Sequence, residues 1–372
     1  MYYDWVKVTQ EFEHQLPLVS ERAYQNINVE TSELGAIIQP RFKHKGSYSS
    51  VINIQISGNR LTVDGNPSKY NRLDNLVGYS SIDQTMHVYN DILRTLGLPE
   101  FTKCKQVYYR QQSGQLTAFS DGAYFQRIDV CSNHATGNGN QTDYLRGIST
   151  LRYRNSIPRL HTNGRGCDWL SPRGNARLVY PKVYDKAHEL RFHALRKMQR
   201  TYGKQSEEAM YIAKLADYLE QQGVVRFEQE FHREYLERKG LRFWGLFDES
   251  EFRTEHEKFI KLDESLKVST MEFETISETL INEGICNSTV SANSTSNYAF
   301  KWMHGYNFAA DANKSSVKTA RARLRKIGID IFNPYNQSQF SPITVKKARE
   351  ITVSNLVLPD WYKRPVVHLH AA

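Results

Sequence analysis

Residues 176–190 read ARLVYPKVYDKAHEL, and this stretch combines two kinds of secondary structure. Its first half is β-branched and aromatic, which favours a strand, and Pro181 indicates an edge strand or a bulge. From Lys186 onward the pattern predicts a helix that continues toward Gln222 and breaks near Gly203. The stretch therefore predicts a strand-to-helix junction, with tyrosines four residues apart on the strand, at 180 and 184.

The segments on either side interleave strands and helices. SVINIQIS (50–57) and LTVDG (61–65) flank a Gly-Asn-Arg turn and predict a hairpin. Ser81 fits the N-cap of a helix that ends near Leu98. AYFQRIDVCS (123–132) and GVVRFEQEF (223–231) predict two further strands. This order indicates an α+β domain with an antiparallel sheet over residues 1–245, rather than a parallel doubly wound sheet.

The character of the chain changes after Trp244. EFETISETLINEGI (272–285) predicts a helix, and the Asn/Ser/Thr-rich run NSTVSANSTSN (287–297) predicts a loop. NKSSVKTARARLRKIGIDI (313–331) predicts a basic helix that carries Lys318, Arg321 and Arg325. We therefore expect a mainly helical DNA-binding region over residues 246–372. Its basic helix is either a helix-turn-helix reader of duplex DNA or a surface that grips phosphates.

Bulk composition restricts the class of protein. The 372 residues carry a net charge of +9, which suits a polyanionic partner, and 40% are hydrophobic, enough for a packed core. We find no signal peptide and no run of 18 apolar residues, so no membrane partner is expected. The four cysteines lack zinc spacing, which favours a reduced, cytoplasmic protein.

Positive charge concentrates around the opening stretch. Residues 143–204 hold fourteen Lys or Arg and four Asp or Glu, a larger surplus than that of the whole chain. Cations interleaved with aromatic residues suit phosphate contact combined with base stacking on a single strand. The candidate phosphate contacts are Arg146, Arg152, Arg154, Arg177 and Lys182, and the interleaved aromatics are Tyr144, Tyr153, Trp169, Tyr180 and Tyr184. The alternative is a solvated basic face above core aromatics.

Three acidic residues lie near these cations. Asp129 and Glu228 occur in the strand segments Arg-Ile-Asp and Arg-Phe-Glu, and two such carboxylates on neighbouring strands can hold Mg²⁺ or Mn²⁺. The alternative for each is an exposed strand residue paired with a nearby arginine. Glu189 follows Lys186 at a spacing of three, so the two share a helix face, where they would otherwise form a surface ion pair.

The motifs in their order resemble a known family. R-I-D, Y-x-K-x-x-E, V-R-F-E and a final P-D-W-Y at 359–362 are similar to the replication initiators of filamentous phages, the nicking-joining proteins of gene II/X type. The match is closest to the initiators of vibrio filamentous phages, through VYDKAHEL and SGNRLTVDGNPS. The resemblance covers most of the chain.

The resemblance implies a function and assigns residues to it. It implies nicking of supercoiled phage DNA at the origin, rolling-circle synthesis from the free 3′-OH and later re-joining of the displaced strand. Tyr184 matches the nucleophile, Asp129 and Glu228 match metal-ligand positions, and Glu189 matches a further acidic position. The implied partners are double-stranded and single-stranded origin DNA, with a host helicase and polymerase. The phenol of a tyrosine ionises only near pH ~10, so we expect Lys186 to assist it.

Several alternatives stay open at the level of sequence. Tyr180 lies on the same side of the strand as Tyr184 and competes for the nucleophile role. A His-Leu-His pattern at 368–370 resembles the metal-binding strand of other nickases, but lies at the chain terminus. A non-enzymatic DNA-binding regulator of a phage or plasmid, and an RNA-processing nuclease, remain alternative functions.

Overall fold

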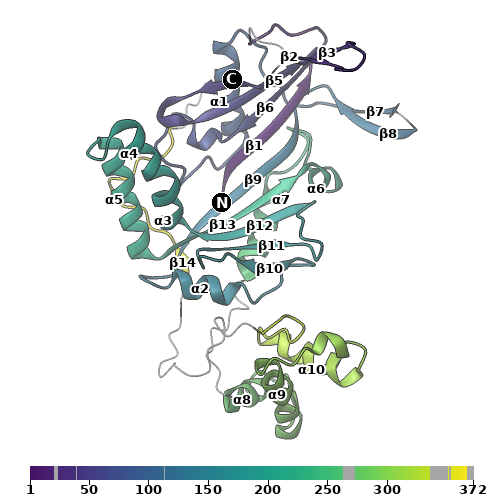
Figure 1. The fold of residues 1–372 in the computed structure, drawn as a ribbon, viewed down its shortest axis with the longest axis vertical. Helices are drawn as coiled ribbons and strands as arrows, with labels where there is room; N and C mark the ends of the chain where they lie inside the picture. Colours follow the sequence, from purple (N-terminus) through teal and green to yellow (C-terminus); the bar gives the residue numbers. More distant parts are fainter. Residues whose placement is uncertain are drawn as a thin grey trace.

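The centre of the protein is a single antiparallel sheet (Figure 1). The computed structural model describes residues 1–20, 24–38, 40–112, 114–262, 273–335, 351 and 353–366. In spatial order the sheet strands are β10 (Ile157–Leu160), β11 (Gly166–Leu170), β12 (Val179–Asp185), β13 (Val224–His232), β9 (Tyr124–Ala135), β1 (Tyr2–Glu11), β6 (Arg60–Gly65), β5 (Val51–Ser57) and β4 (Phe42–Lys45), with β14 (Ser354–Asn355) also paired to β9.

Helices and two ribbons surround this sheet. The helices are α1 (Ile82–Thr95), α2 (Gln141–Ile148), α3 (Lys186–Glu189), α4 (Arg196–Tyr202), α5 (Glu207–Gln222), α6 (Arg233–Arg238), α7 (Ser250–Ile260), α8 (Phe273–Asn282), α9 (Thr289–Met303) and α10 (Ser315–Lys326). A π-helical turn, η3 (Leu190–Leu195), joins α3 to α4, and the 3-10 turns are η1 (Ser47–Ser49), η2 (Pro67–Lys69) and η5 (Phe308–Asp311). The ribbons are β2 (Tyr24–Ile27) with β3 (Leu34–Ile38), and β7 (Val107–Gln112) with β8 (Gln115–Ser120). The predicted α+β class is confirmed.

Many local predictions are also confirmed. The hairpin β5–β6 turns at Gly58, whose φ of 64° suits glycine. Ser81 caps α1 by accepting a hydrogen bond from the backbone N–H of Asp83. The long helix after Lys186 breaks at Gly203, as expected, and α5 ends at Gly223. Gly223 has a φ of +67°, and a Cβ there would lie 1.9 Å from the carbonyl oxygen of Gly137, so this position requires glycine.

Two local predictions are wrong. β12 is not an edge strand, because it lies between β11 and β13. Its ladder with β11 ends at the pair Asp168–Lys182, so Pro181 lies where the strand has only β13 as a partner. The Asn/Ser/Thr-rich run at 287–297 is not a loop but the larger part of α9, capped by Ser288 and packed through Ala292. Burial of small residues on one face has outweighed weak helix propensity.

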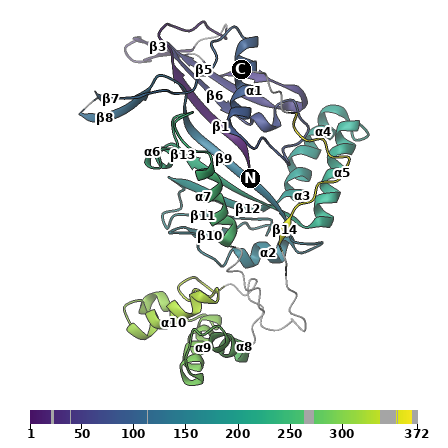
Figure 2. The same ribbon diagram turned by 180° about the vertical axis from the view of Figure 1, so that it is seen from behind.

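The sheet carries cores on both sides. On the face turned away in Figure 1, α7 lies across β11–β13, as Figure 2 shows, and its Phe259 packs with Trp169 and Phe227. Helices α3–α5 pack against one another and against the start of β13 at Val224. Within the described parts of the chain, no helix is long and apolar enough to cross a bilayer.

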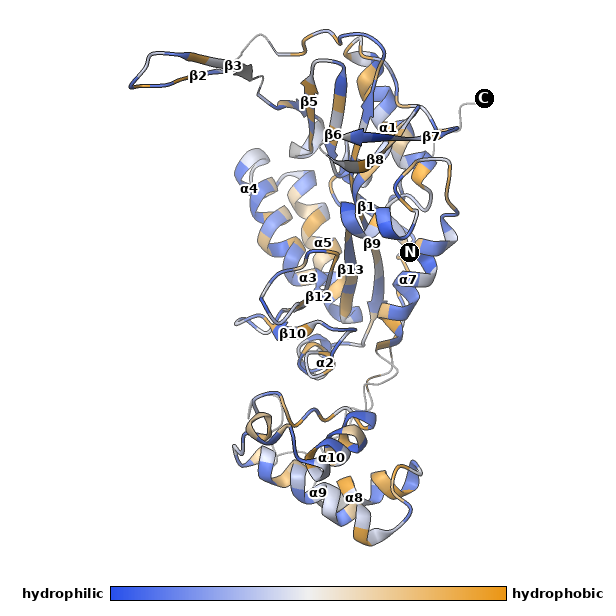
Figure 3. Cartoon of the chain, turned by 90° about the vertical axis from the view of Figure 1, so that its right-hand side faces the viewer, coloured by the Kyte–Doolittle hydropathy of each residue, from blue (hydrophilic) through white to orange (hydrophobic). Residues whose placement is uncertain are grey.

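Helices α8–α10 form a separate helical lobe with its own core, at one end of the sheet (Figure 3). The chain between α9 and α10, residues 304–314, is longer than the three- or four-residue turn of a helix-turn-helix. The chain then returns to the sheet, where β14 pairs with β9 and Tyr362 packs among α3–α5. The domain boundary at residue 245 stays a prediction; the His-Leu-His pattern at 368–370 lies outside the described residues.

Candidate active site

The strand register brings a row of polar side chains to one face of the sheet. Tyr184, Lys182 and Tyr180 of β12 lie opposite Arg226, Glu228 and Glu230 of β13. The same residues of β13 lie opposite Asn133, Cys131 and Asp129 of β9. Because side chains alternate along a strand, all nine share one face, the face opposite Phe227 and α7. We call this the polar face.

Three carboxylates meet on the polar face. Oxygen atoms of Asp129, Glu228 and Glu230 lie within 4.8 Å of one another, and all three residues are buried. Arg127 pairs with Asp129 at 2.5 Å and with Glu230 at 2.9 Å. Lys182 pairs with Glu228 at 2.9 Å and with Glu230 at 2.5 Å. This carboxylate cluster holds three acids against two cations, so it is short of one positive charge.

The pKa values show which carboxylate bears the effect of the missing positive charge. Although burial opposes ionisation of Glu230, hydrogen bonding from His232 and the charge of Lys182 lower its pKa to about 2. Burial raises the pKa of Asp129 well above its usual range, with Arg127 opposing and Glu228 adding to the shift. The cluster therefore keeps Glu230 charged and resists the charge on Asp129, which is the environment that an added cation would relieve.

Tyr184 is hydrogen-bonded to this cluster. Its phenol donates to Glu228 Oε2 over 2.8 Å, and its side chain is half-buried. Burial raises the pKa of Tyr184, the charge of Glu228 raises it further, and Arg226 lowers it. The group is therefore a phenol at neutral pH, with a carboxylate in place to receive its proton.

The hydrogen bonds of Lys186 go to residues other than Tyr184. Its buried ammonium donates to Asn75 Oδ1 over 3.0 Å and to Glu189 Oε2 over 2.6 Å. The predicted pairing of Lys186 with Glu189 along the helix is present, although buried rather than on the surface. Burial opposes the charge of Glu189, but Lys186 brings its pKa below the usual value. Glu189 thus partners Lys186 and is not a member of the carboxylate cluster.

Arg226 is the cation that the structure places beside Tyr184. It is fully buried and lies opposite Tyr184 in the ladder between β12 and β13. Its Nε donates to Asn133, and its Nη2 donates to the backbone carbonyls of Asn75 and Leu76. Its Nη1 has no hydrogen-bond partner within the described chain, and lies 4.0 Å from Asp4 Oδ2. Sequence reasoning used the V-R-F-E motif for its glutamate and missed this arginine.

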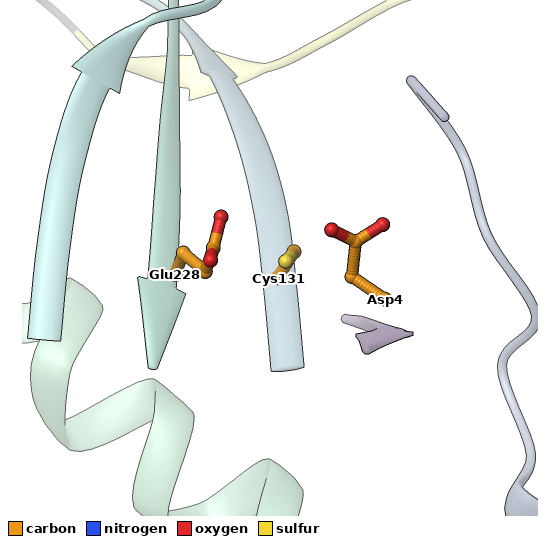
Figure 4. A group of neighbouring side chains, drawn as sticks. All are labelled: Asp4, Cys131 and Glu228. Atoms are coloured by element: carbon orange, nitrogen blue, oxygen red, sulfur yellow. The ribbon is translucent and has the colours of Figure 1, made fainter. Parts of the chain in front are cut away.

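A second group shares Glu228 with the carboxylate cluster. Ligand atoms of Asp4, Cys131 and Glu228 lie within 4.8 Å of one another, and Figure 4 shows the three side chains converging from neighbouring strands. Burial and the charge of Glu228 raise the pKa of the Cys131 thiol. Asp4 was missed because it is isolated in the N-terminal sequence, with no motif around it. Glu230 had a visible signal, since Arg226, Glu228 and Glu230 alternate along one strand.

Tyr180 faces a different acceptor. Its phenol donates to Asp168 Oδ2 of β11 over 2.7 Å, and burial together with Asp168 raises its pKa to about 12. The two candidate tyrosines therefore share the polar face, but the Tyr184 phenol donates to a carboxylate of the cluster, whereas the Tyr180 phenol donates to Asp168. This difference favours Tyr184 as the group to test first.

The candidate DNA-binding residues are scattered, and several are already paired with acids. Arg152 contacts Asp330 of the helical lobe, Arg154 pairs with Glu255, and Arg177 pairs with Glu234. Lys182 belongs to the carboxylate cluster, and Arg321 makes two hydrogen bonds to Asp330. The candidates with exposed side chains are Arg146, Arg154, Arg177, Lys318 and Arg325. Tyr144, Tyr153 and Trp169 are buried in the core beneath α7, so they cannot stack on bases.

The fold and the site describe an α+β protein with a buried acidic and basic centre that contacts a half-buried tyrosine. The chain belongs to the family of phage replication-associated proteins of gene II type. The model of that family's N-terminal region matches residues 1–250, and the model of its C-terminal region matches residues 280–368. The replication-associated protein of Escherichia phage If1 is 46% identical over 324 residues, which are 87% of this chain and all of that protein. No solved structure matches. The resemblance to filamentous-phage initiators is confirmed, and with it a role in phage DNA replication.

Proposed function

We propose that the protein initiates rolling-circle replication by nicking one strand of supercoiled phage DNA at the origin, with Tyr184 as the nucleophile. The hydrogen bond from the Tyr184 phenol to Glu228 carries this proposal. A nucleophilic hydroxyl needs a base within hydrogen-bond reach, and Glu228 meets that requirement. Membership of the replication-associated protein family supports the setting, because it links the chain to phage DNA replication.

The covalent step follows from this pair. Glu228 accepts the phenol proton, and the Tyr184 oxygen attacks phosphorus as the bond from phosphorus to the 3′ oxygen breaks. The 3′ oxygen takes a proton from water, and the proton on Glu228 neutralises the hydroxide, which leaves a free 3′-OH and a 5′-phosphotyrosine. In the reverse step a 3′-OH attacks the phosphotyrosine, re-joins the displaced strand and returns the proton to the phenol. A tyrosine rather than water thereby retains the phosphodiester bond energy for re-joining.

Arg226 takes the supporting role that the sequence suggested for Lys186. Its buried guanidinium is held by Asn133 and by two backbone carbonyls, and its charge favours the ionised form of Tyr184. Lys186 and Glu189 neutralise each other beside it, at the first turn of α3. In this proposal the Lys186–Glu189 pair positions the helix that follows the nucleophile.

Asp129, Glu228 and Glu230 are the residues that would hold Mg²⁺ or Mn²⁺. They fit because they offer hard oxygen ligands in a cluster that is short of one positive charge. When bound, such an ion supplies Lewis-acid polarisation of the scissile phosphate. In its absence Arg127 and Lys182 offset two of the three carboxylate charges and link the three strands.

We assign nicking to residues 1–245 together with α7 and β14, which pack on the same sheet, and duplex binding to the helical lobe α8–α10 within residues 246–372. Lys318 and Arg325 on α10 have exposed side chains that suit phosphate contact. The free 3′-OH would be extended by a host polymerase, and a host helicase would unwind the displaced strand, in the cytoplasm of the bacterial host.

The test is the covalent adduct. Wild-type protein incubated with supercoiled origin DNA and Mn²⁺ should yield an open circle with protein on its 5′ end, and peptide mapping should find the adduct on Tyr184. Tyr184→Phe should abolish adduct and nicking, whereas Tyr180→Phe, a matched loss of one hydroxyl from the same strand face, should at most slow them. An adduct on Tyr180 would overturn the assignment. A wild-type protein that binds the circle but leaves it closed would identify a regulator instead.

A further inference from the structure

The helix that follows Tyr184 carries an exposed aromatic ring between two basic side chains. Phe192 is 48% exposed on the π-helical turn η3. The imidazole of His188, one turn before it, is stacked at a centroid distance of 6.1 Å and an interplanar angle of 19°. The guanidinium of Arg196, one turn after it, lies 4.4 Å from the ring centroid. Single exposed apolar side chains are common on proteins, so it is the ring's place between an imidazole and a guanidinium on one helix that sets Phe192 apart.

The helix segregates its two faces. Ala187, Leu190, Ala194 and Met198 are buried against α5. The outward row, which we call the stacking platform, consists of half-buried His188 and exposed Phe192, Arg196 and Arg200, spaced four residues apart. The Phe192 ring is therefore not part of the core. An apolar side chain that stays on the surface contributes little to folding. π-helical turns are themselves rare and frequent at functional sites.

The charge around the platform selects the class of partner. Residues 190–206 contain five Lys or Arg and no Asp or Glu. Within the described chain, Arg196 and Arg200 form no ion pair with a carboxylate, unlike Arg191, which pairs with Asp217 and Glu220. Two unpaired cations that follow an exposed ring along one helix face match a strand whose phosphates and bases alternate.

We propose that the stacking platform binds single-stranded DNA next to the nucleophile, with a base taking the place of the His188 imidazole against the Phe192 ring and phosphates on Arg196 and Arg200. α3 begins at Lys186, directly after the strand that ends in Tyr184 and Asp185. Phe192 lies six residues into this helix, about 9 Å along its axis. In a duplex that length spans roughly two to three nucleotides at 3.4 Å each, and in an extended single strand it spans fewer. The inference rests on the proposed function in one respect, namely that the strand bound by the stacking platform is the strand that Tyr184 nicks.

Binding measured in the Tyr184→Phe background tests the platform without any dependence on nicking. Two fluorescent oligonucleotides of equal length and charge are compared at fixed salt, one of thymidines and one with abasic residues. The parent variant should prefer the thymidine strand. Adding Phe192→Ala should weaken thymidine binding by about 5- to 100-fold and abasic binding far less. Phe192→Trp should restore the preference, because it restores a ring.

Two controls keep the result specific. Met210→Ala removes an exposed apolar side chain from α5, beside Glu207 and Glu208, and should leave both affinities unchanged. Arg196→Gln should weaken the binding of both strands to the same extent. Loss of one phosphate contact should also reduce the slope of log affinity against log salt concentration by about 0.7. The proposal would be overturned if Phe192→Ala and its parent bound the thymidine strand with equal affinity. It would also be overturned if Phe192→Ala lost as much affinity for the abasic strand as for the thymidine strand. Failure of the adduct test above would leave these outcomes unaffected.

Discussion

Replacing Lys182 with methionine isolates the charge balance of the carboxylate cluster. The substitution keeps the length of the side chain but removes the ammonium that lies 2.9 Å from Glu228 and 2.5 Å from Glu230. Three buried carboxylates would then face Arg127 alone. Removing one partner of a buried ion pair costs about 3–5 kcal/mol. Because 24% of the Lys182 side chain is exposed, we expect a loss near the lower end, about 3 kcal/mol.

A divalent cation should replace the lost charge in this variant. A ligand present at about one hundred times its Kd stabilises the folded protein by about 2.7 kcal/mol, so Mn²⁺ should recover most of the loss. Urea unfolding followed by circular dichroism, in EDTA and in increasing Mn²⁺, measures both quantities. Lys103→Met is the matched control, because Lys103 pairs with Asp83 at 2.6 Å but on the surface, where such a pair contributes at most about 1 kcal/mol.

Two results would refute this reasoning. If Lys182→Met unfolds in EDTA at the same urea concentration as wild type, the cluster does not depend on the ammonium for stability. If the variant is destabilised but does not respond to Mn²⁺ or Mg²⁺, the three carboxylates are not a metal site. The urea concentration at which Lys103→Met unfolds should be close to that of wild type in EDTA, and added Mn²⁺ should change it no more than it changes wild type.

Three further predictions concern other parts of the molecule. Burial lowers the pKa of His134 to about 4 and that of His256 to about 3, below the ordinary 6.5. As the pH falls, the unfolded chain therefore binds protons before the folded chain does. The free energy of unfolding should decrease as the pH decreases from 6.5, and it should decrease less steeply in His256→Gln. Arg325→Ala should weaken duplex DNA binding without a change in Tm, whereas Arg321→Ala should lower Tm, since Arg321 holds Asp330; fluorescence anisotropy and thermal melts separate the two. Tyr362→Phe should cost about 1–3 kcal/mol in urea unfolding, because Asp74 and the N–H of Val77 lose their partner hydroxyl.

Local sequence patterns predicted the elements whose side chains alternate or recur regularly. The hairpin at 50–65, the capped helix at 82 and the strand at 223–231 follow from such periodicity. The same reasoning failed for α9, because Ser288 and Asn-rich positions look like a loop until their partners in α8 and α10 are known. It also identified as candidate stacking groups three aromatics that α7 covers. Periodicity shows which face is apolar, but not which neighbour will cover it.

The site was predictable only in part, for a related reason. Tyr184, Asp129 and Glu228 were identified from motifs, but the residues that act on them come from register. Arg226 meets Tyr184, and Lys182 meets Glu228, because β12 and β13 pair in one particular alignment, which no single strand reveals. Lys186 follows Tyr184 closely in sequence, yet its first helical turn directs the ammonium to Glu189.

The return of the chain to the sheet makes the helical lobe an insertion. Ile260 before it and Ile351 after it pack against the same hydrophobic cluster, beneath α7. Both ends of the inserted segment are thus fixed close together, and the entropy of closing such a loop grows only slowly with its length. The lobe can therefore differ in length without any change in the sheet that carries Tyr184 and the carboxylate cluster.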